Sequence, residues 1–250
     1  MATIPKLPNK YQWLPDLPDF RDFKYSLVPI VVPHKADVLP VCSPVEDQST
    51  LGSCTGNALV GGMECLENIQ KKPFVDLSRL FIYYNERAIE GSISQDSGAS
   101  IRDGIKSLAA QGVCTESLWP YNIAKFKNKP TPACYTEALS RKISLYMRLS
   151  TLADMKNCIA AGFPFVFGFS VYTSFESAQV AKTGIVNLPV VGEKLLGGHA
   201  VLAVGYDDAS NRFLVRNSWG ASWGQKGYFT IPYTYLTNTN LADDFWTIRK

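Results

Sequence analysis

Hydrophobic and polar positions divide the chain into a first half with helical spacing and a second half with strand-like runs. From Cys54 onward, the segment CTGNALVGGMECLENIQ places small and apolar residues at helical spacing, which predicts a helix that begins near Cys54. The segment LSRLFIYYNERAIEG predicts a second helix between Ser78 and Gly91. A third helix, ASIRDGIKSLAAQG, is expected to end at Gly112, because glycine commonly terminates helices.

Beyond Pro132 the pattern changes to short runs rich in aromatic and β-branched residues, separated by turn residues. These runs predict strands, and they are ISLYMRLS, FPFVFGFSVY, HAVLAVGYD, RFLVRNSW and GYFTIPY. One helix, LADMKNCIAAG, interrupts them before Pro164. We therefore predict an α+β fold, with a helical lobe at about 45–135, a β lobe at about 140–250 and a cleft between the two.

The N-terminal segment differs from both halves because it is rich in proline. Its seven prolines are Pro5, Pro8, Pro15, Pro18, Pro29, Pro33 and Pro40. Proline at this density excludes a long helix and predicts an extended arm that lies over a preformed surface. We accordingly separate an arm, residues 1–35, from a domain spanning residues 36–250.

Composition narrows the class of protein. With 46% hydrophobic and 19% charged residues among 250, the chain can bury a large core. A formal charge of +3, spread along the chain, predicts neither a nucleic-acid partner nor an anionic membrane surface. No apolar run approaches the roughly 18 residues of a membrane span, and the start has no secretory core. We expect a cytoplasmic protein, or one exported by a route not visible in this chain.

The candidate chemistry begins with Cys54. Six cysteines are too few for a disulfide scaffold and lack zinc-site spacing, so no metal site is predicted. A thiol at a helix N-terminus meets the positive end of the helix dipole, which favours the thiolate. Gly52 and Ser53 are small enough to admit a substrate backbone, and Gln48 is placed to donate to an oxyanion together with the Cys54 N–H. Taken alone, this pattern fits a buried structural thiol equally well.

Only two histidines exist, His34 and His199, so any imidazole chemistry must use one of them. His199 follows two glycines at the start of a predicted strand, and Asn217 ends the next strand. An amide oxygen there would accept the imidazole N–H and fix the tautomer, and Trp219 would shield that bond from water. Individually, these residues also fit a core histidine, a hairpin asparagine and a core aromatic.

Together these segments resemble the signature segments of papain-like cysteine peptidases. The matching segments, in the order of the family, are PVEDQSTLGSCTGNA, GGHAVLAVGYD and RNSWGASWGQKGYF. The resemblance extends from about Ala36 to the C-terminus and includes LWPYN and FGFSVYTSF, the latter of which resembles cathepsin B-like sequences. His199 lies 145 residues after Cys54 and Asn217 lies 163 after it, against about 130–150 in the family. Thr55 stands where plant and animal members usually have tryptophan.

The resemblance implies a papain-like two-lobed fold and cysteine endopeptidase activity without metal or organic cofactor. A Cys54 thiolate would attack the peptide carbonyl, His199 would protonate the leaving amine, and water would hydrolyse the thioester. The side chain two residues before the scissile bond would enter a pocket formed by Ile101, Gly168, Gly197 and Gly198, with its floor near Asp243. An exopeptidase, an acyl-transferring relative and a catalytically silent binding protein are the alternatives.

The arm is similar to the short arms of prokaryotic relatives, in which such a segment lies across the cleft. We expect residues Tyr11 to Val32 to restrain activity as in a zymogen, and a permanent structural wrap is the competing hypothesis. The implied partners are a peptide or protein substrate and epoxysuccinyl or cystatin-like inhibitors, and the expected state is a monomer. Cys114 and Cys134 bracket the LWPYN segment and are candidates for a disulfide.

Overall fold

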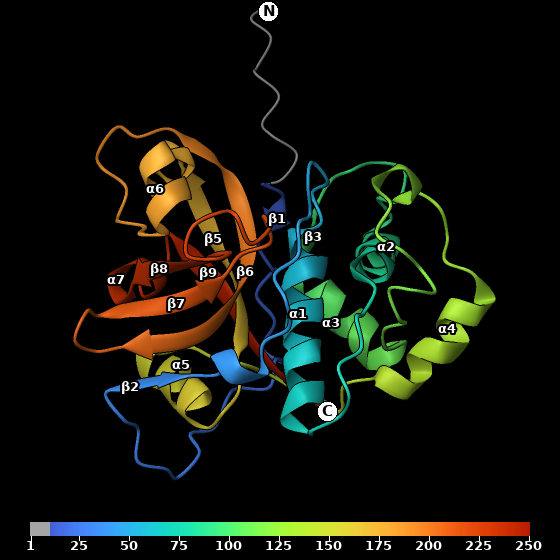
Figure 1. Cartoon of the computed structure of the whole chain (residues 1–250), viewed down its shortest axis with the longest axis horizontal. Coiled ribbons are helices and arrows are strands. Elements are labelled where there is room, and N and C mark those ends of the chain that lie inside the picture. The colour runs from blue at the N-terminus through green and yellow to red at the C-terminus, as the bar shows by residue number, and fades with distance from the viewer. Residues whose placement is uncertain (1–10) are drawn as a thin grey trace, which may run out of the picture.

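The helices of the first half of the chain lie on one side of the molecule, and the twisted sheet with the helices of the second half lies on the other (Figure 1). The structure is a computed structural model, and it describes residues 11–250. The arrangement confirms the predicted α+β architecture of a helical lobe and a β lobe. Within the described residues, no helix is both long and apolar enough to cross a membrane.

The helical lobe is built from helices whose ends follow the capping residues in the sequence. Its helices are α1 (Cys54–Ile69), α2 (Arg79–Glu90), α3 (Ile101–Ala110) and α4 (Pro132–Ala138). The Ser78 side chain accepts a hydrogen bond from the Phe81 N–H at the start of α2, and Gly91 ends that helix at a positive φ of 72°. The predicted start of α1 at Cys54 is confirmed.

The β lobe contains a seven-stranded sheet with the strand order β4-β9-β5-β6-β7-β8, and β2 pairs with β6 off this path. Its strands are β2 (Lys35–Asp37), β4 (Leu145–Arg148), β5 (Phe165–Tyr172), β6 (Leu195–Asp207), β7 (Arg212–Arg216), β8 (Tyr228–Pro232) and β9 (Ala242–Arg249). The helices of this half are α5 (Leu152–Ala160), α6 (Ala178–Thr183) and α7 (Tyr233–Leu236). Short 3-10 helices span Leu39–Val41, Ile123–Lys125, Leu139–Arg141 and Thr173–Glu176. Strand β6 carries His199, which pairs with Phe169 of β5.

Two apolar cores stabilise the fold. One joins α1, α2 and α3 to the near face of the sheet through residues such as Leu59, Met63 and Leu202. The other lies within the β lobe and is dominated by buried phenylalanines of β5, β7 and β8. Because α1 packs against β6 in the first core, the N-terminus of α1 is fixed beside the strand that carries His199.

The N-terminal arm passes between the two lobes (Figure 1). Its strand β1 (Trp13–Leu14) pairs in parallel with β3 (Ala99–Ser100) from the helical side. On the other side, Gln12 forms a parallel bridge with Gly198 of β6. The arm is therefore hydrogen-bonded to both lobes. Residues 1–10 of the predicted arm lie outside the described residues.

Candidate active site

Cys54 is the first residue of α1 and is completely buried, with 0% of its surface exposed. Burial raises the pKa of its thiol to about 11, which outweighs the lowering caused by backbone hydrogen bonds from Ala200, Gln12 and Thr55. One of these donors, Gln12, belongs to the arm. The arm therefore supplies one of the hydrogen-bond donors that face the Cys54 sulfur.

His199 is buried next to the asparagine that the sequence analysis paired with it. The distance between His199 Nε2 and Asn217 Oδ1 is 2.8 Å, so the imidazole donates to the amide oxygen. The Trp219 ring stacks against the imidazole at 5.1 Å between centroids and 27° between planes. Since Ala200, the neighbour of His199, donates to the Cys54 sulfur, the imidazole and the thiol lie in one site.

The side chain of Gln48 is buried and held from both ends. Its Nε2 donates to the Leu51 carbonyl at 2.9 Å, and its Oε1 accepts from Ser218 Oγ at 2.5 Å. Its backbone N–H also donates to the Ser218 carbonyl at 2.8 Å. Ser218 therefore sets the orientation of the Gln48 amide. The sequence analysis missed this role, although Ser218 lies between Asn217 and Trp219, both of which it singled out.

Gly52 and Ser53 form the turn before α1, and two further residues that the sequence analysis missed support them. The Gly52 N–H donates to the Asp96 carboxylate at 3.0 Å. The Ser53 hydroxyl is 2.5 Å from the hydroxyl of Tyr121, which also donates to the Gln48 carbonyl at 2.9 Å. These contacts fix the loop in front of Cys54 from the helical lobe. Tyr121 belongs to LWPYN, the only sequence signal that pointed to it.

Thr55, the residue after Cys54, forms a buried hydrogen bond with a carboxyl group. Its hydroxyl donates to the Glu86 carboxyl of α2 at 2.5 Å. Burial raises the pKa of Glu86 well above its ordinary value, and the hydrogen bond from Thr55 offsets this only in part. The first turn of α1 is thus tied to α2 through a buried carboxyl group with a raised pKa.

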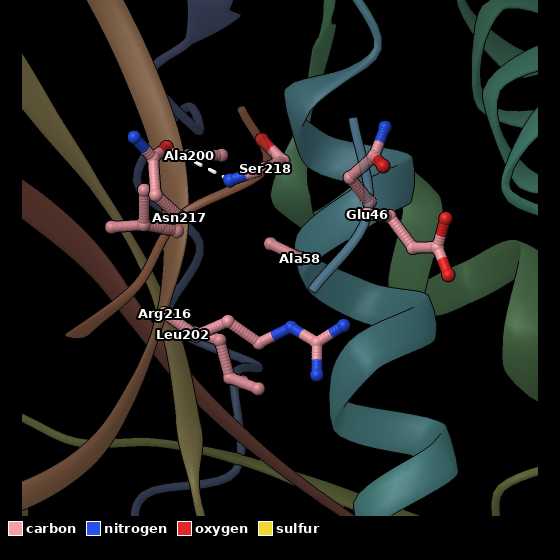
Figure 2. A pocket seen from close by; sticks show the side chains of 9 residues that line it. Glu46, Ala58, Ala200, Leu202, Arg216, Asn217 and Ser218 are labelled. Atoms are coloured by element: carbon pink, nitrogen blue, oxygen red, sulfur yellow. Dashed lines mark hydrogen bonds between the residues drawn. The ribbon is translucent and has the colours of Figure 1, made fainter. Parts of the chain in front are cut away.

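A cavity of about 10 Å³ lies between α1 and the strands β6 and β7. Figure 2 shows side chains that line it. The dashed line marks the bond from the Ser218 N–H to Asn217 Oδ1, at 2.9 Å. Below it, Arg216 reaches from β7 toward α1, and its guanidinium donates to the Ser43 carbonyl at 2.6 Å. This cavity has room for about one water molecule at most, so it is too small to receive a substrate side chain.

A trough lined by glycines runs along the site, and the arm fills it. A Cβ atom on Gly168 would lie 1.9 Å from the Trp13 ring, and one on Gly198 would lie 2.7 Å from it. At Gly197, a Cβ would lie 2.8 Å from the Tyr11 carbonyl. Ile101 is buried in the same apolar cluster as Trp13. The three glycines predicted to form pocket walls therefore face the arm.

Of the two adjacent acids in β9, Asp244 contacts the arm through Trp13, whereas the side chain of the predicted Asp243, which pairs with Gly168 through its backbone, points to solvent. The Asp243 side chain is 52% exposed and pairs with Arg148 at 2.8 Å. The Asp244 side chain is 0% exposed, and its Oδ2 accepts from the Trp13 indole N–H at 3.2 Å. The reason is a backbone irregularity, because Asp244 adopts a φ of 57° within β9 and turns its side chain inward.

All six cysteines are free thiols. The predicted candidates Cys114 and Cys134 lie in contact as thiols, and Cys65 Sγ lies 3.7 Å from Cys42 Sγ. Within residues 11–250, no group of histidine, cysteine or carboxylate side chains is arranged to hold a metal ion.

Known proteins are similar to this chain in sequence and in fold. The family described as papain family cysteine protease matches residues 32–246. An uncharacterized peptidase C1-like protein of Acanthamoeba polyphaga mimivirus is 46% identical, with 87% of this chain and 73% of that protein covered. Chymopapain of Carica papaya is 28% identical, over 76% of this chain and 51% of the relative. The crystal structure of xylellain, a cysteine protease from Xylella fastidiosa, matches at 42% identity and a TM-score of 0.93, covering 100% of this chain and 99% of the other.

Proposed function

The chain belongs to the papain family of cysteine proteases, and from this premise we propose that it is an endopeptidase with Cys54 as nucleophile. His199 is its general base, and Asn217 orients the histidine. The observation that carries this assignment is the 2.8 Å bond between His199 and Asn217, beside a cysteine at the start of a helix. This is the arrangement needed for a thiolate–imidazolium pair.

In the proposed reaction, the Cys54 thiol transfers its proton to His199, and the thiolate attacks the carbonyl carbon of the scissile bond. The Gln48 amide and the Cys54 backbone N–H donate to the oxyanion that develops. His199 then protonates the leaving amine, and water hydrolyses the thioester to release the acid and regenerate the thiol. The Ser218 contact supports this role of Gln48, because it fixes which end of the amide faces Leu51.

We further propose that residues 1–35 form an arm that acts as a short propeptide, with the peptidase domain at 36–250 and its lobes at about 45–135 and 140–250. Trp13 in the glycine-lined trough and the complete burial of Cys54 support this division. A substrate cannot reach the sulfur while the arm lies there. Activity then requires the arm to move away or to be cut.

The pocket that Trp13 fills is proposed to receive the substrate side chain two residues before the scissile bond. Its walls are Ile101, Gly168, Gly197 and Gly198, and small walls leave room for a large side chain. With Asp244 as its floor, the pocket accepts a basic side chain beside hydrophobic ones, since a buried carboxylate needs a donor. Peptides, proteins and inhibitors that mimic them are the proposed ligands.

The test is turnover of a fluorogenic peptide before and after removal of residues 1–34, with Cys54→Ser as the matched control. We expect a gain in turnover on removal, which Cys54→Ser abolishes. No gain would contradict the role of the arm, and a gain that survives in Cys54→Ser would contradict the nucleophile. Product formation that rises with added amine would identify acyl transfer in place of hydrolysis.

A further inference from the structure

The arm is attached to the enzyme through a pair of buried carboxyl groups, Asp16 from the arm and Asp244 from β9. Both side chains are 0% exposed. Asp244 Oδ2 accepts from the Asp16 backbone N–H at 2.8 Å and from the Trp13 indole at 3.2 Å. In return, the Asp16 carboxylate accepts from the Trp246 indole at 2.8 Å and from the Arg102 backbone N–H at 3.1 Å. Asp244 thus accepts hydrogen bonds from the arm, and Asp16 of the arm accepts hydrogen bonds from the peptidase domain.

Acidic groups outnumber basic groups around this pair, even with the two lysines that line the hollows beside Asp16. Lys106 pairs with Asp103 at 2.8 Å, and Lys24 lines the same hollow as Asp19 and Asp22. The arm brings a second acid, Asp22, which meets Arg102 at 2.5 Å, and the enzyme adds Asp243. Arg148 is the other cation, and it lies near four carboxylates: Asp244 at 2.9 Å, Asp243 at 2.8 Å, Asp22 at 3.5 Å and Asp16 at 3.8 Å. Glu90 of α2 adds a further acidic group that interacts with Asp16.

Two guanidinium groups therefore face four carboxylates, and two of these are brought in by the arm itself. If all four were ionised, docking would bury a surplus of negative charge. A proton on the Asp16–Asp244 pair removes part of that surplus, and the neutral carboxyl still keeps acceptor atoms for the indole and amide donors. No such proton is required once the arm leaves and water reaches both groups.

We propose that docking of the arm takes up a proton at the Asp16–Asp244 pair, so that the arm closes the cleft more tightly in mildly acidic solution and releases it toward neutral pH. This inference rests on the proposed role of the arm. We call this arrangement a pH-dependent latch, because the arm is released from the cleft as the pH rises.

The direction follows from the environment of the two acids. Burial raises the pKa of Asp244 to about 7, with the Asp16 charge as the next cause, and burial also raises the pKa of Asp16. In a released arm, Asp16 returns toward an ordinary pKa of about 4. Because the docked state binds the proton more tightly, docking is strongest below about pH 4 and weakens as pH rises toward 7. The loss is up to about tenfold in the docking constant per pH unit.

The experiment measures the rate of Cys54 alkylation by iodoacetamide in the full chain from about pH 5 to about pH 7.5, with mass spectrometry to locate the label. Trp13→Ala serves as the open reference, since it removes the ring from the trough. Dividing the wild-type rate by the Trp13→Ala rate at each pH cancels the ionisation of Cys54 itself. We expect this ratio to rise at least about tenfold over the range.

In the double variant Asp16→Asn/Asp244→Asn, the same ratio should change by less than about threefold, because neither side chain ionises. If that variant does not fold, Asp16→Asn alone, which changes only the arm, should reduce the rise. A wild-type ratio that stays constant or falls with pH would overturn the latch. Equal labelling of wild type and Trp13→Ala at low pH would instead contradict occlusion by the arm, and no labelling of Cys54 in either would contradict the nucleophile.

Discussion

The side chain of Trp13 fills the trough beside Gly168 and Gly198, so its removal should open the site. Trp13 is 7% exposed, its ring lies against Gly168 and Gly198, and its indole donates to Asp244. A buried aromatic side chain covers about 150–250 Å². Truncating one to alanine costs about 3–5 kcal/mol. We expect Trp13→Ala to weaken docking of the arm by at least about 100-fold.

The assay is the second-order rate constant for inactivation of the full chain by an epoxysuccinyl inhibitor. Phe20→Ala is the matched control, because Phe20 is another aromatic residue of the arm but is 98% exposed. Trp13→Ala should react at least about 100-fold faster than wild type, and Phe20→Ala should react at the wild-type rate. If the two variants react equally, the contact of Trp13 with the trough does not hold the arm, and the reasoning is refuted.

Three further predictions concern the site beneath the arm. Asn217→Ala should lower kcat about 10- to 100-fold with little change in KM, because the His199 ring loses its 2.8 Å partner, and steady-state kinetics after arm removal would measure this. Ser218→Ala and Gln48→Ala should each lower kcat, and the double variant should lose less than the product of the two losses, since the side chains act as a unit. The raised pKa of Glu86 means that its carboxyl contributes fully to folding stability below about pH 4.3 and that this contribution is lost as pH rises. The stability of Glu86→Gln relative to wild type should therefore increase with pH. Urea denaturation at about pH 5 and about pH 8 would test this, and an equal difference at both pH values would contradict it.

Local sequence signals were enough to predict the framework of the site. Ser78 and Gly91 mark the ends of α2 because their effects act within one helical turn. The start of α1 at Cys54, the position of His199 in β6 and that of Asn217 directly after β7 follow from the same kind of short-range pattern. Such positions need no knowledge of how distant segments pack.

Features that depend on long-range packing escaped prediction. The difference between Asp243 and Asp244 is a single residue in β9, and it is decided by a left-handed backbone conformation that alternation in a strand does not anticipate. The contact of Ser218 with Gln48 joins residues 170 positions apart. The reciprocal bonds of Asp16 and Asp244 likewise arise only when the arm lies across the folded domain.

The central claim is that Cys54 and His199 form a reactive pair, and one measurement tests both residues together. The arm-free protein would be treated with an epoxysuccinyl inhibitor at mildly acidic pH, the modified residue located by mass spectrometry, and the experiment repeated with His199→Ala. We predict one label per chain, confined to Cys54 and lost in the variant. Labelling of another cysteine, or labelling of Cys54 that persists at the same rate in His199→Ala, would contradict the account.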